Sequence, residues 1–461
     1  MVKLDRYAKV LAGVLKKVKP SPAEEKEMEG VMGSVVAVAR KHANPMVCGS
    51  SVKGTWLSGR NELDLFLLYP PALPRKQLEE KGVAAAKAIV KELGGTFVIA
   101  YAEHPYVRGK ISVNGKAFDI DVVPCYDVKD PAKIKSAVDR TPHHVRFVNA
   151  NIGRKGDEVR LLKQFCKGIG VYGADTRTQG ISGYICELLI LAYGSFEAVL
   201  REASNWRPPH AVGKGAEKFD SPLVIIDPVD SNRNAAAAVS AENFSRFVFE
   251  ARRFMKNPNE RFFFPKIKKL TKADIDKLVW RGTQWLAIVA PRPDVIDDVL
   301  WPQMRRARHR LVKELEQSEF HVMRSFEWAS ENEDGKGELA LVFEMEVWTL
   351  PPVQRMHGPP ITAHDHSARF LEKYGKPRFG PFVDGQGCWF IEKDRTFTTA
   401  GQLLKAFLRR PAIRLEESGI PNFIAAAMAK HRLLEGRKFW AWVQKSDISE
   451  LMWKKYMKKL Q

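Results

Sequence analysis

The sequence predicts an α+β protein with more than one domain, and three observations lead to this class. Its 461 residues exceed what a single hydrophobic core usually serves. Segments with helical periodicity are interspersed with short runs in which apolar and polar residues alternate, as in strands with one buried face. The composition changes after the aromatic run 262–265, where lysines become frequent, and we place a domain boundary there.

Helices are predicted from periodicity and from signals at their ends. The clearest start is at Ser21, because an N-cap hydroxyl followed by Pro22 and Glu24 is the pattern of a capping box. The helices expected in the N-terminal half cover residues 3–18, 22–42, 74–93, 158–169 and 182–200, and an alanine-rich helix is expected to begin at Arg233. Further along, residues 297–317 and 399–408 are expected to be helical.

Strands are predicted where apolar and β-branched residues form short runs between turn signals. The expected strands cover residues 46–48, 62–69, 96–101, 111–113, 117–123, 223–226, 285–289 and 339–348. Asn114-Gly115 separates two of them and is a strong signal for a hairpin.

A small-residue turn directly precedes a strand that carries two acidic residues. The turn begins at Gly49-Ser50, and the strand covers residues 62–69. Because side chains two apart in a strand point to the same face, Glu62 and Asp64 project together. Neighbouring carboxylates repel one another, so this arrangement indicates a divalent cation, and oxygen ligands suit Mg²⁺. The N–H groups and hydroxyls of the turn are suited to binding phosphates.

A second acidic pair lies on the strand predicted over residues 117–123. Asp119 and Asp121 share one face of it. A mixed sheet that places this face beside Glu62 and Asp64 would create a site with three carboxylates. Alternation alone does not choose between the two aspartates, and it is equally compatible with a solvated sheet face.

The chain is strongly basic, with a formal net charge of +20 and a pI of about 9.6. An excess of this size favours polyanionic partners such as nucleic acid, although a membrane surface or a solvated basic face has the same composition. Positive charge is concentrated on the predicted helix 297–317, where Arg305, Arg306 and Arg308 are candidates for RNA binding.

The five cysteines are scattered and form no C-x-x-C pair, so we expect reduced thiols in a cytoplasmic protein. The N-terminus has no apolar signal core. The most apolar stretch, residues 181–200, is interrupted by Glu187 and Glu197, which favours a buried helix over a membrane span. We therefore expect no association with a membrane.

The order of Gly49-Ser50, the acidic pair at 62–64 and the later Asp121 resembles the signature of the DNA polymerase β superfamily of nucleotidyltransferases. Longer strings make the chain similar to the archaeal, class I CCA-adding enzymes, which are tRNA nucleotidyltransferases. The resemblance is densest over residues 40–240 and is still visible around 293–303. The strings that carry it cover residues 102–107, 121–126, 135–142, 158–163 and 182–184.

This resemblance implies a nucleotidyltransferase head with a mixed β-sheet (residues 1–150), a helical neck that recognises the nucleotide base and phosphates (151–265), and an α/β body and tail that bind tRNA (266–461). It implies template-independent addition of C-C-A to the tRNA 3′ end from CTP and ATP, by two-metal nucleotidyl transfer with Mg²⁺. The implied partners are the 3′ end and acceptor arm of tRNA, and a homodimer is compatible with the sequence.

The resemblance also implies roles for individual residues. Glu62, Asp64 and Asp121 would be the catalytic metal ligands, with Asp121 chosen over Asp119 because it directly precedes Val-Val-Pro-Cys-Tyr. Nucleotide contacts are implied for Ser50, Lys53, His144, Lys163, Tyr172 and Arg233, the last of which would face the base edge. The family usually has arginine at the position of Lys53, and lysine keeps the charge but loses the bidentate fork.

Three other functions compete with this interpretation. A poly(A)-type or other terminal RNA nucleotidyltransferase would share the carboxylates and differ in base choice and product length. A glycosyltransferase with a D-x-D metal site explains neither the Gly-Ser turn nor the basic charge. A catalytically inactive RNA-binding relative would have no reason to keep three clustered carboxylates, which repel one another without metal.

Overall fold

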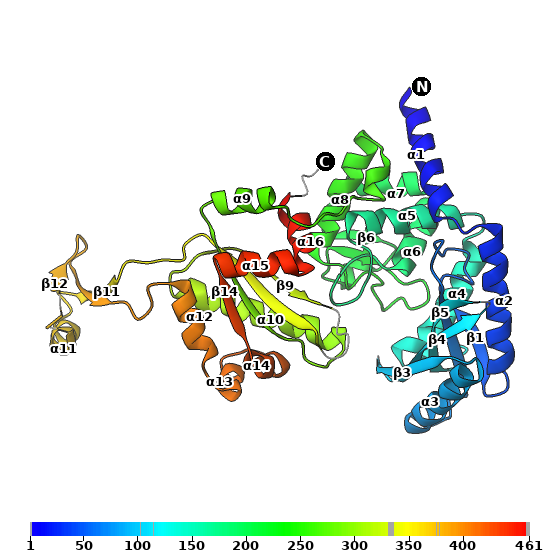
Figure 1. Ribbon diagram of the computed structural model, residues 1–461, viewed down its shortest axis with the longest axis horizontal. Helices are drawn as coiled ribbons and strands as arrows, with labels where there is room; N and C mark the ends of the chain where they lie inside the picture. The colour runs from blue at the N-terminus through cyan, green and yellow to red at the C-terminus, as the bar shows by residue number, and fades with distance from the viewer. Residues whose placement is uncertain are drawn as a thin grey trace. The chain divides into compact units, whose positions relative to one another are not determined.

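The structure is a computed structural model that describes residues 2–101, 103–113, 115–330, 336–374, 376–377 and 379–457. The chain divides into two compact units, Met1–Lys266 and Ile267–Gln461, and Figure 1 labels many of their elements. Both units combine helices with sheets, so the predicted α+β class is confirmed.

The N-terminal unit contains a five-stranded sheet with the order β1-β2-β5-β4-β3. Its strands are β1 (Asn44–Cys48), β2 (Glu62–Tyr69), β3 (Thr96–Tyr101), β4 (Pro105–Val113) and β5 (Lys116–Tyr126). The β2–β5 pair is parallel and the other pairs are antiparallel, so the sheet is mixed, as predicted. The hairpin expected at Asn114-Gly115 joins β4 to β5; Asn114 itself lies outside the described residues, and Gly115 has a φ of +79°.

Two helices, α2 (Pro22–Ala39) and α3 (Arg75–Glu92), cover one face of this sheet (Figure 1). The core between them and the sheet takes Leu63, Leu65 and Leu67 from β2, so the acidic residues of that strand face the other way. The capping box predicted at Ser21 is present.

The remainder of this unit is mainly helical and packs around Phe165, whose ring contacts five other phenylalanines at centroid distances of 5.6–6.2 Å. Its helices are α1 (Val2–Val18), α4 (Arg140–Asn151), α5 (Gly156–Ile169), α6 (Gly183–Tyr193), α7 (Phe196–Ala203) and α8 (Ala241–Lys256). Short strands β6 (His210–Val212) and β7 (Leu223–Ile225) form a parallel pair. Single 3₁₀ turns cover Pro131–Lys133, Ala137–Asp139, Ala216–Lys218 and Glu260–Phe262.

Two helix predictions need correction in this region. The helix expected over residues 182–200 is two helices, because Gly194 ends α6 with a φ of +93°. The helix expected at Arg233 is absent: Ala235 donates its N–H to the carbonyl of Ile225 at 2.8 Å, and the next helix begins at Ala241. Pairing with the end of β7 therefore prevails over the helix propensity of alanine.

No single helix among the described residues is long and apolar enough to cross a membrane. Only together are the consecutive helices α6 and α7 long and apolar enough for a membrane span among the described residues, and they are bent by 91° relative to one another. Their apolar side chains belong to the core around Phe165.

The C-terminal unit contains a four-stranded antiparallel sheet with the order β14-β8-β10-β9. These strands are β8 (Gln284–Pro291), β9 (Val322–Ala329), β10 (Glu338–Met345) and β14 (Arg432–Glu435). One face packs on α10 (Asp297–Gln317), α12 (Ala400–Leu408), α13 (Ala412–Glu417) and α14 (Asn422–Met428). The other packs on α9 (Lys272–Trp280), α15 (Arg437–Lys445) and α16 (Ile448–Met452), and a final helical turn covers Trp453–Met457.

A second, three-stranded sheet belongs to the same unit and has the order β11-β13-β12. Its elements are β11 (Val353–Pro360), β12 (Phe379–Val383), β13 (Cys388–Asp394) and the helix α11 (His364–Tyr374).

The packing of α3 on β5 leads to a test of the head fold. A Cβ added at the buried Gly82 would overlap the ring of Pro124, whereas one added at Gly30, on an exposed position of α2, meets nothing within 4 Å. We expect Gly82→Ala to lower the free energy of unfolding by about 1–3 kcal/mol through overpacking. Gly30→Ala, the matched control, should raise it by roughly 0.5–1 kcal/mol through helix propensity. Urea unfolding measures both, and equal effects would contradict the packing described.

Candidate active site

Strand register brings the three predicted carboxylates together on one face of the sheet. In the parallel β2–β5 pair, Asp64 lies opposite Asp121, and Glu62 lies opposite Asp119. Burial is the main reason that the pKa of Asp64 is raised to about 6, and the charges of Asp121 and Glu62 add to the shift. Asp119 is exposed and is not among the groups that act on Asp64. The geometry thus favours Asp121 as the third member of the cluster.

The turn after β1 approaches the cluster so closely that it requires glycine. Gly49 has a φ of +80°, and a Cβ on it would overlap Oδ2 of Asp64. Ser50 follows immediately and is partly buried, and its carbonyl accepts the N–H of Thr55 at 3.1 Å, which closes the turn. The expected neighbourhood of the Gly-Ser turn and the acidic pair is therefore present.

Two arginines that sequence reasoning did not single out neutralise the outer carboxylates. Nε of Arg108, opposite Asp121 on β4, donates to Oδ1 of Asp121 at 3.1 Å. A terminal nitrogen of Arg60 donates to Oε1 of Glu62 at 2.8 Å. Among the described residues, no group of three histidine, cysteine, aspartate or glutamate side chains is already arranged to hold a metal ion. The donor set itself, carboxylate oxygens from neighbouring strands, is the kind that hard divalent cations prefer.

Lys53 and Lys163, both predicted to contact phosphates, are joined by a glutamate that is fully buried. Glu187 on α6 accepts from Nζ of Lys53 at 2.5 Å and from the hydroxyl of Thr55 at 2.7 Å. Nζ of Lys163 lies 3.4 Å from Glu187 and donates to the carbonyl and the hydroxyl of Thr55 at 3.1 and 3.0 Å. These contacts occupy all three donors of the Lys163 ammonium group.

The pKa values of Glu187 and Lys163 reflect the balance of charge among Glu187, Lys53 and Lys163. Burial opposes ionisation of Glu187, yet Lys163 and Lys53 hold the pKa of Glu187 below its usual value. Burial lowers the pKa of Lys163, and Glu187 partly offsets that effect. Sequence reasoning recognised Glu187 only as an interruption of an apolar stretch, because nothing local indicates its two lysine partners.

Tyr172 lies at the edge of the same region, next to a lysine that was not predicted. The Tyr172 hydroxyl packs against Gly183, where an added Cβ would lie 3.1 Å from it. Nζ of Lys167 lies 5.0 Å from the centre of the Tyr172 ring. Burial, followed by the charge of Arg60, lowers the pKa of Lys167 to about 8, and Glu62 acts in the opposite direction. Lys167 is therefore near the carboxylate cluster and adds to its positive surroundings.

His144 and Arg233 are brought together by a second buried acid, Asp227. Its carboxylate contacts Nε2 of His144 at 2.9 Å and accepts from Arg233 at 2.8 Å and from the Tyr184 hydroxyl at 2.9 Å. The imidazole of His144 also stacks on Tyr184, with 4.0 Å between ring centroids. Burial alone would raise the pKa of Asp227, but hydrogen bonds led by that of His144 lower it to about 2.

The three arginines predicted to bind RNA lie on α10 of the C-terminal unit and differ in environment. Arg305 and Arg308 both pair with Glu327 on β9, at 3.3 and 2.7 Å. Arg306 is exposed. Pairing with Glu327 reduces the charge that the first two present, so the arginine cluster is less basic than its sequence suggests.

The raised pKa of Asp64 predicts a pH dependence of stability for the metal-free protein. The folded chain binds the Asp64 proton more tightly than the unfolded chain. The free energy of unfolding that protonation of Asp64 contributes is therefore fully present below about pH 4 and is lost as the pH rises through about 6. Asparagine does not ionise, so Asp64→Asn should not lose stability as the pH rises. Above pH 6 the variant should exceed the parent in free energy of unfolding by up to about 3 kcal/mol, and near pH 4 the two should be equal. Urea unfolding in EDTA across this range measures the difference, and a difference independent of pH would contradict the assignment.

The Glu187 network predicts a large effect of removing its only carboxylate. Glu187→Gln leaves two lysines buried without a counter-charge, and we expect the free energy of unfolding to fall by about 3 kcal/mol. Glu197→Gln is the matched control, because Glu197 forms an exposed pair with Arg201 on α7 that contributes less than about 1 kcal/mol. Thermal and urea unfolding of the two variants check this, and similar losses would contradict the network.

Two family models agree with the resemblance found in the sequence. Residues 157–264 match the family model of the tRNA nucleotidyltransferase second domain, and residues 281–415 match that of the CCA-adding enzyme C-terminal domain. Among solved structures, E. coli MS115-1 CdnC with ATP aligns with a TM-score of 0.42 and 17% identity over 56% of this chain and 93% of its own. Apo mtPAP aligns with a TM-score of 0.41 and 13% identity over 55% and 70%.

Curated relatives match almost the whole chain. The CCA-adding enzyme of Methanoregula boonei is 39% identical over 92% of this chain and 90% of its own length. That of Halobacterium salinarum is 39% identical over 88% and 90%, and that of Methanosarcina mazei is 37% identical over 85% and 87%. Identity at this level over almost the whole length shows that the chain, whose β2–β5 register sets Asp64 opposite Asp121, belongs to the family of archaeal CCA-adding enzymes, the tRNA nucleotidyltransferases.

Proposed function

We propose that Glu62, Asp64 and Asp121 hold two Mg²⁺ ions for the addition of C-C-A to the 3′ end of tRNA from CTP and ATP. The observation that carries this proposal is the β2–β5 register, which sets Asp64 against Asp121 on the face that also carries Glu62. Divalent metal ions are general in nucleotidyltransferases, and Mg²⁺ suits a cluster made only of carboxylate oxygens. Bound there, the ions supply Lewis-acid stabilisation of the attacking and leaving oxygens.

Release of the arginines is part of this proposal. Arg108 and Arg60 pair with Asp121 and Glu62 in the metal-free protein, and both arginine side chains are more than half exposed. Exposed ion pairs contribute little free energy, so these arginines give way to a divalent cation at small cost. Asp121, once freed, is placed to take the proton of the tRNA terminal hydroxyl.

The nucleotide contacts follow from the two buried acids. Ser50 and the N–H groups of its turn, with Lys53, Lys163 and Tyr172, are proposed to face the triphosphate, and Glu187 positions the two lysines. Lys53 retains one-tenth exposure of its side chain, while Lys163 is almost fully covered. We therefore assign the direct phosphate contact to Lys53 and a supporting charge to Lys163.

Base selection is assigned to the group around Asp227. Arg233 and His144 are held by this carboxylate, and the Arg233 side chain is 35% exposed, so it keeps donors for a ligand. Cytosine and adenine both offer an exocyclic amine and a ring nitrogen acceptor on the Watson–Crick edge. Guanine and uracil lack this pattern, so a site that donates to the ring nitrogen would leave its own polar groups unpaired when either base binds. Unpaired buried polar groups cost free energy, and the site would therefore reject guanine and uracil strongly.

The remaining assignments concern domains, partners and location. We assign residues 1–150 to the head, 151–265 to the neck and 266–461 to a body and tail that bind the tRNA acceptor arm, with Arg306 as the most accessible of the three arginines on α10. Five unpaired cysteines accord with a cytoplasmic location. Sedimentation analysis would establish whether the chain forms a homodimer.

The carboxylate assignment is tested with a tRNA that lacks its CCA end. Asp64→Ala and Asp121→Ala should lower kcat/KM for CMP incorporation by about a thousandfold or more, because several kcal/mol of transition-state stabilisation are lost. Binding of tRNA should change little. Asp119→Ala, the neighbouring carboxylate on β5, is the matched control and should retain activity. A reversed result for the two β5 aspartates would overturn the assignment.

The same assay separates CCA addition from poly(A)-type activity. With CTP alone the product should gain only the missing cytidines, and with CTP and ATP together it should stop after the terminal adenosine. A long homopolymer from ATP alone would favour the poly(A)-type alternative, and tRNA binding without incorporation would favour the inactive relative.

A further inference from the structure

A pocket lies in the N-terminal unit, on the face of the five-stranded sheet opposite to the carboxylates. It has a volume of about 270 Å³ and is formed where the chain leaves β2 and β5. Tyr126, in its wall, is five residues beyond Asp121 on β5, which is roughly 16 Å along the strand. An odd number of residues also turns its side chain to the other face. The lining residues are Ala72, Leu73, Pro74, Arg75, Leu78, His104, Tyr126, Lys135 and Ser136.

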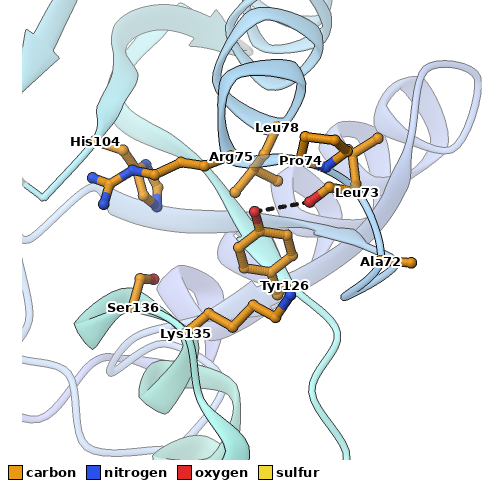
Figure 2. Close-up of a pocket in the computed structure, with 9 residues that line it drawn as sticks. All are labelled: Ala72, Leu73, Pro74, Arg75, Leu78, His104, Tyr126, Lys135 and Ser136. Atoms are coloured by element: carbon orange, nitrogen blue, oxygen red, sulfur yellow. Dashed lines mark hydrogen bonds between the residues drawn. The ribbon is translucent and has the colours of Figure 1, made fainter.

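The most unusual group in this pocket is a buried histidine. His104 is only 4% exposed, and neither of its ring nitrogens has a hydrogen-bond partner among the described residues. Burying an unpaired polar group costs free energy, commonly about 1–3 kcal/mol. Figure 2 shows the imidazole beside Arg75 at the edge of the pocket. An acceptor or donor supplied by a ligand would satisfy it.

Positive charge converges on the same space. Arg75 donates to the backbone oxygen of Glu103 at 2.6 Å and to Glu79 at 3.0 Å, and Lys135 donates to the backbone oxygen of Pro71 at 2.5 Å. These bonds use two of the five arginine donors and one of the three lysine donors. The acidic side chains near the pocket are already engaged: Glu103 accepts the N–H of Ala137, and Asp139 accepts those of residues 126, 135 and 136.

A helix terminus adds to this charge. The 18-residue helix α3 begins at the pocket, and its N-cap is Pro74, which makes no side-chain hydrogen bond to the first N–H groups. Unsatisfied N–H groups at a helix N-terminus attract anions, and phosphate is a common occupant. The wall opposite is apolar: the Tyr126 ring packs with Leu78 and Leu73, and its hydroxyl is bonded to the carbonyl of Leu73 at 3.0 Å (Figure 2).

We propose that this pocket binds a small phosphate-bearing molecule, separate from the nucleotide at the carboxylate site. The phosphate group would lie between Arg75, Lys135, the imidazole of His104 and the start of α3, with the Ser136 hydroxyl as a further donor. The volume of the pocket exceeds what phosphate alone fills, and the Tyr126 wall suits the carbon skeleton of a phosphomonoester. The proposal does not depend on the assignment of the catalytic residues.

The test is phosphate binding to the full chain in EDTA, measured by calorimetry with inorganic phosphate and ribose 5-phosphate at constant ionic strength. Arg75→Gln and Lys135→Gln should each weaken binding by about tenfold, as expected for one charge-assisted hydrogen bond. Lys76→Gln is the matched control, since Lys76 is an exposed neighbour in the first turn of α3 and does not line the pocket. Tighter binding of the ester identifies it as the ligand class, and equal binding identifies the free phosphate group.

His104→Phe separates a ligand contact from a structural role. It keeps the ring volume and removes both unpaired nitrogens, so the ligand-free variant should melt at the same temperature as the parent or higher, and yet bind phosphate at least about tenfold more weakly. Phosphate affinity that falls in Lys53→Gln but is unchanged in the Arg75 and His104 variants would place the anion at the catalytic site and overturn the proposal. Equal phosphate affinity in the parent and in all variants would also overturn the proposal.

Discussion

Electrostatic repulsion among carboxylates on two neighbouring parallel strands is the constraint on which the candidate active site depends. Asp64 and Asp121 are directly opposite in the register, and burial of Asp64 weakens the screening that water would supply. Nearby positive charge offsets this repulsion. It comes from Arg108 on β4, from Arg60 before β2 and from Lys167 on α5. These basic side chains offset part of the carboxylate charge where Asp64 and Asp121 face one another.

The same logic extends into the helical part of the N-terminal unit, where two buried acids organise cations from distant segments. Glu187 joins the turn after β1 to α5 and α6 through Lys53 and Lys163. Asp227 joins α4 to the segment after β7 through His144 and Arg233. Since a buried charge without a partner is strongly destabilising, each network sets the position of the side chains it holds. Under the proposed function, Glu187 and Asp227 would orient the side chains that contact the nucleotide.

Prediction from sequence succeeded where the deciding interactions are local. Alternation put the two acids of β2 on one face, and the capping box at Ser21 was visible in four consecutive residues. It failed where a distant contact prevailed, as at Arg233, where the following alanines pair with the end of β7 instead of forming a helix. Alternation alone left Asp119 and Asp121 equivalent, because both lie opposite an acid of β2 in the register, and only the family resemblance favoured Asp121 before the structure was known.

By itself, the sequence determined the family, the acidic faces of two strands and the glycine turn beside them, because these are properties of adjacent residues and of their order. Only the tertiary structure decided which strands are neighbours, that Lys53 and Lys163 share Glu187, and that the buried His104 lines a pocket away from the carboxylates. The physical reason is that ion pairing and burial join residues that are distant in the sequence, such as Lys53 and Glu187, which are 134 positions apart. Local periodicity carries no information about such partners.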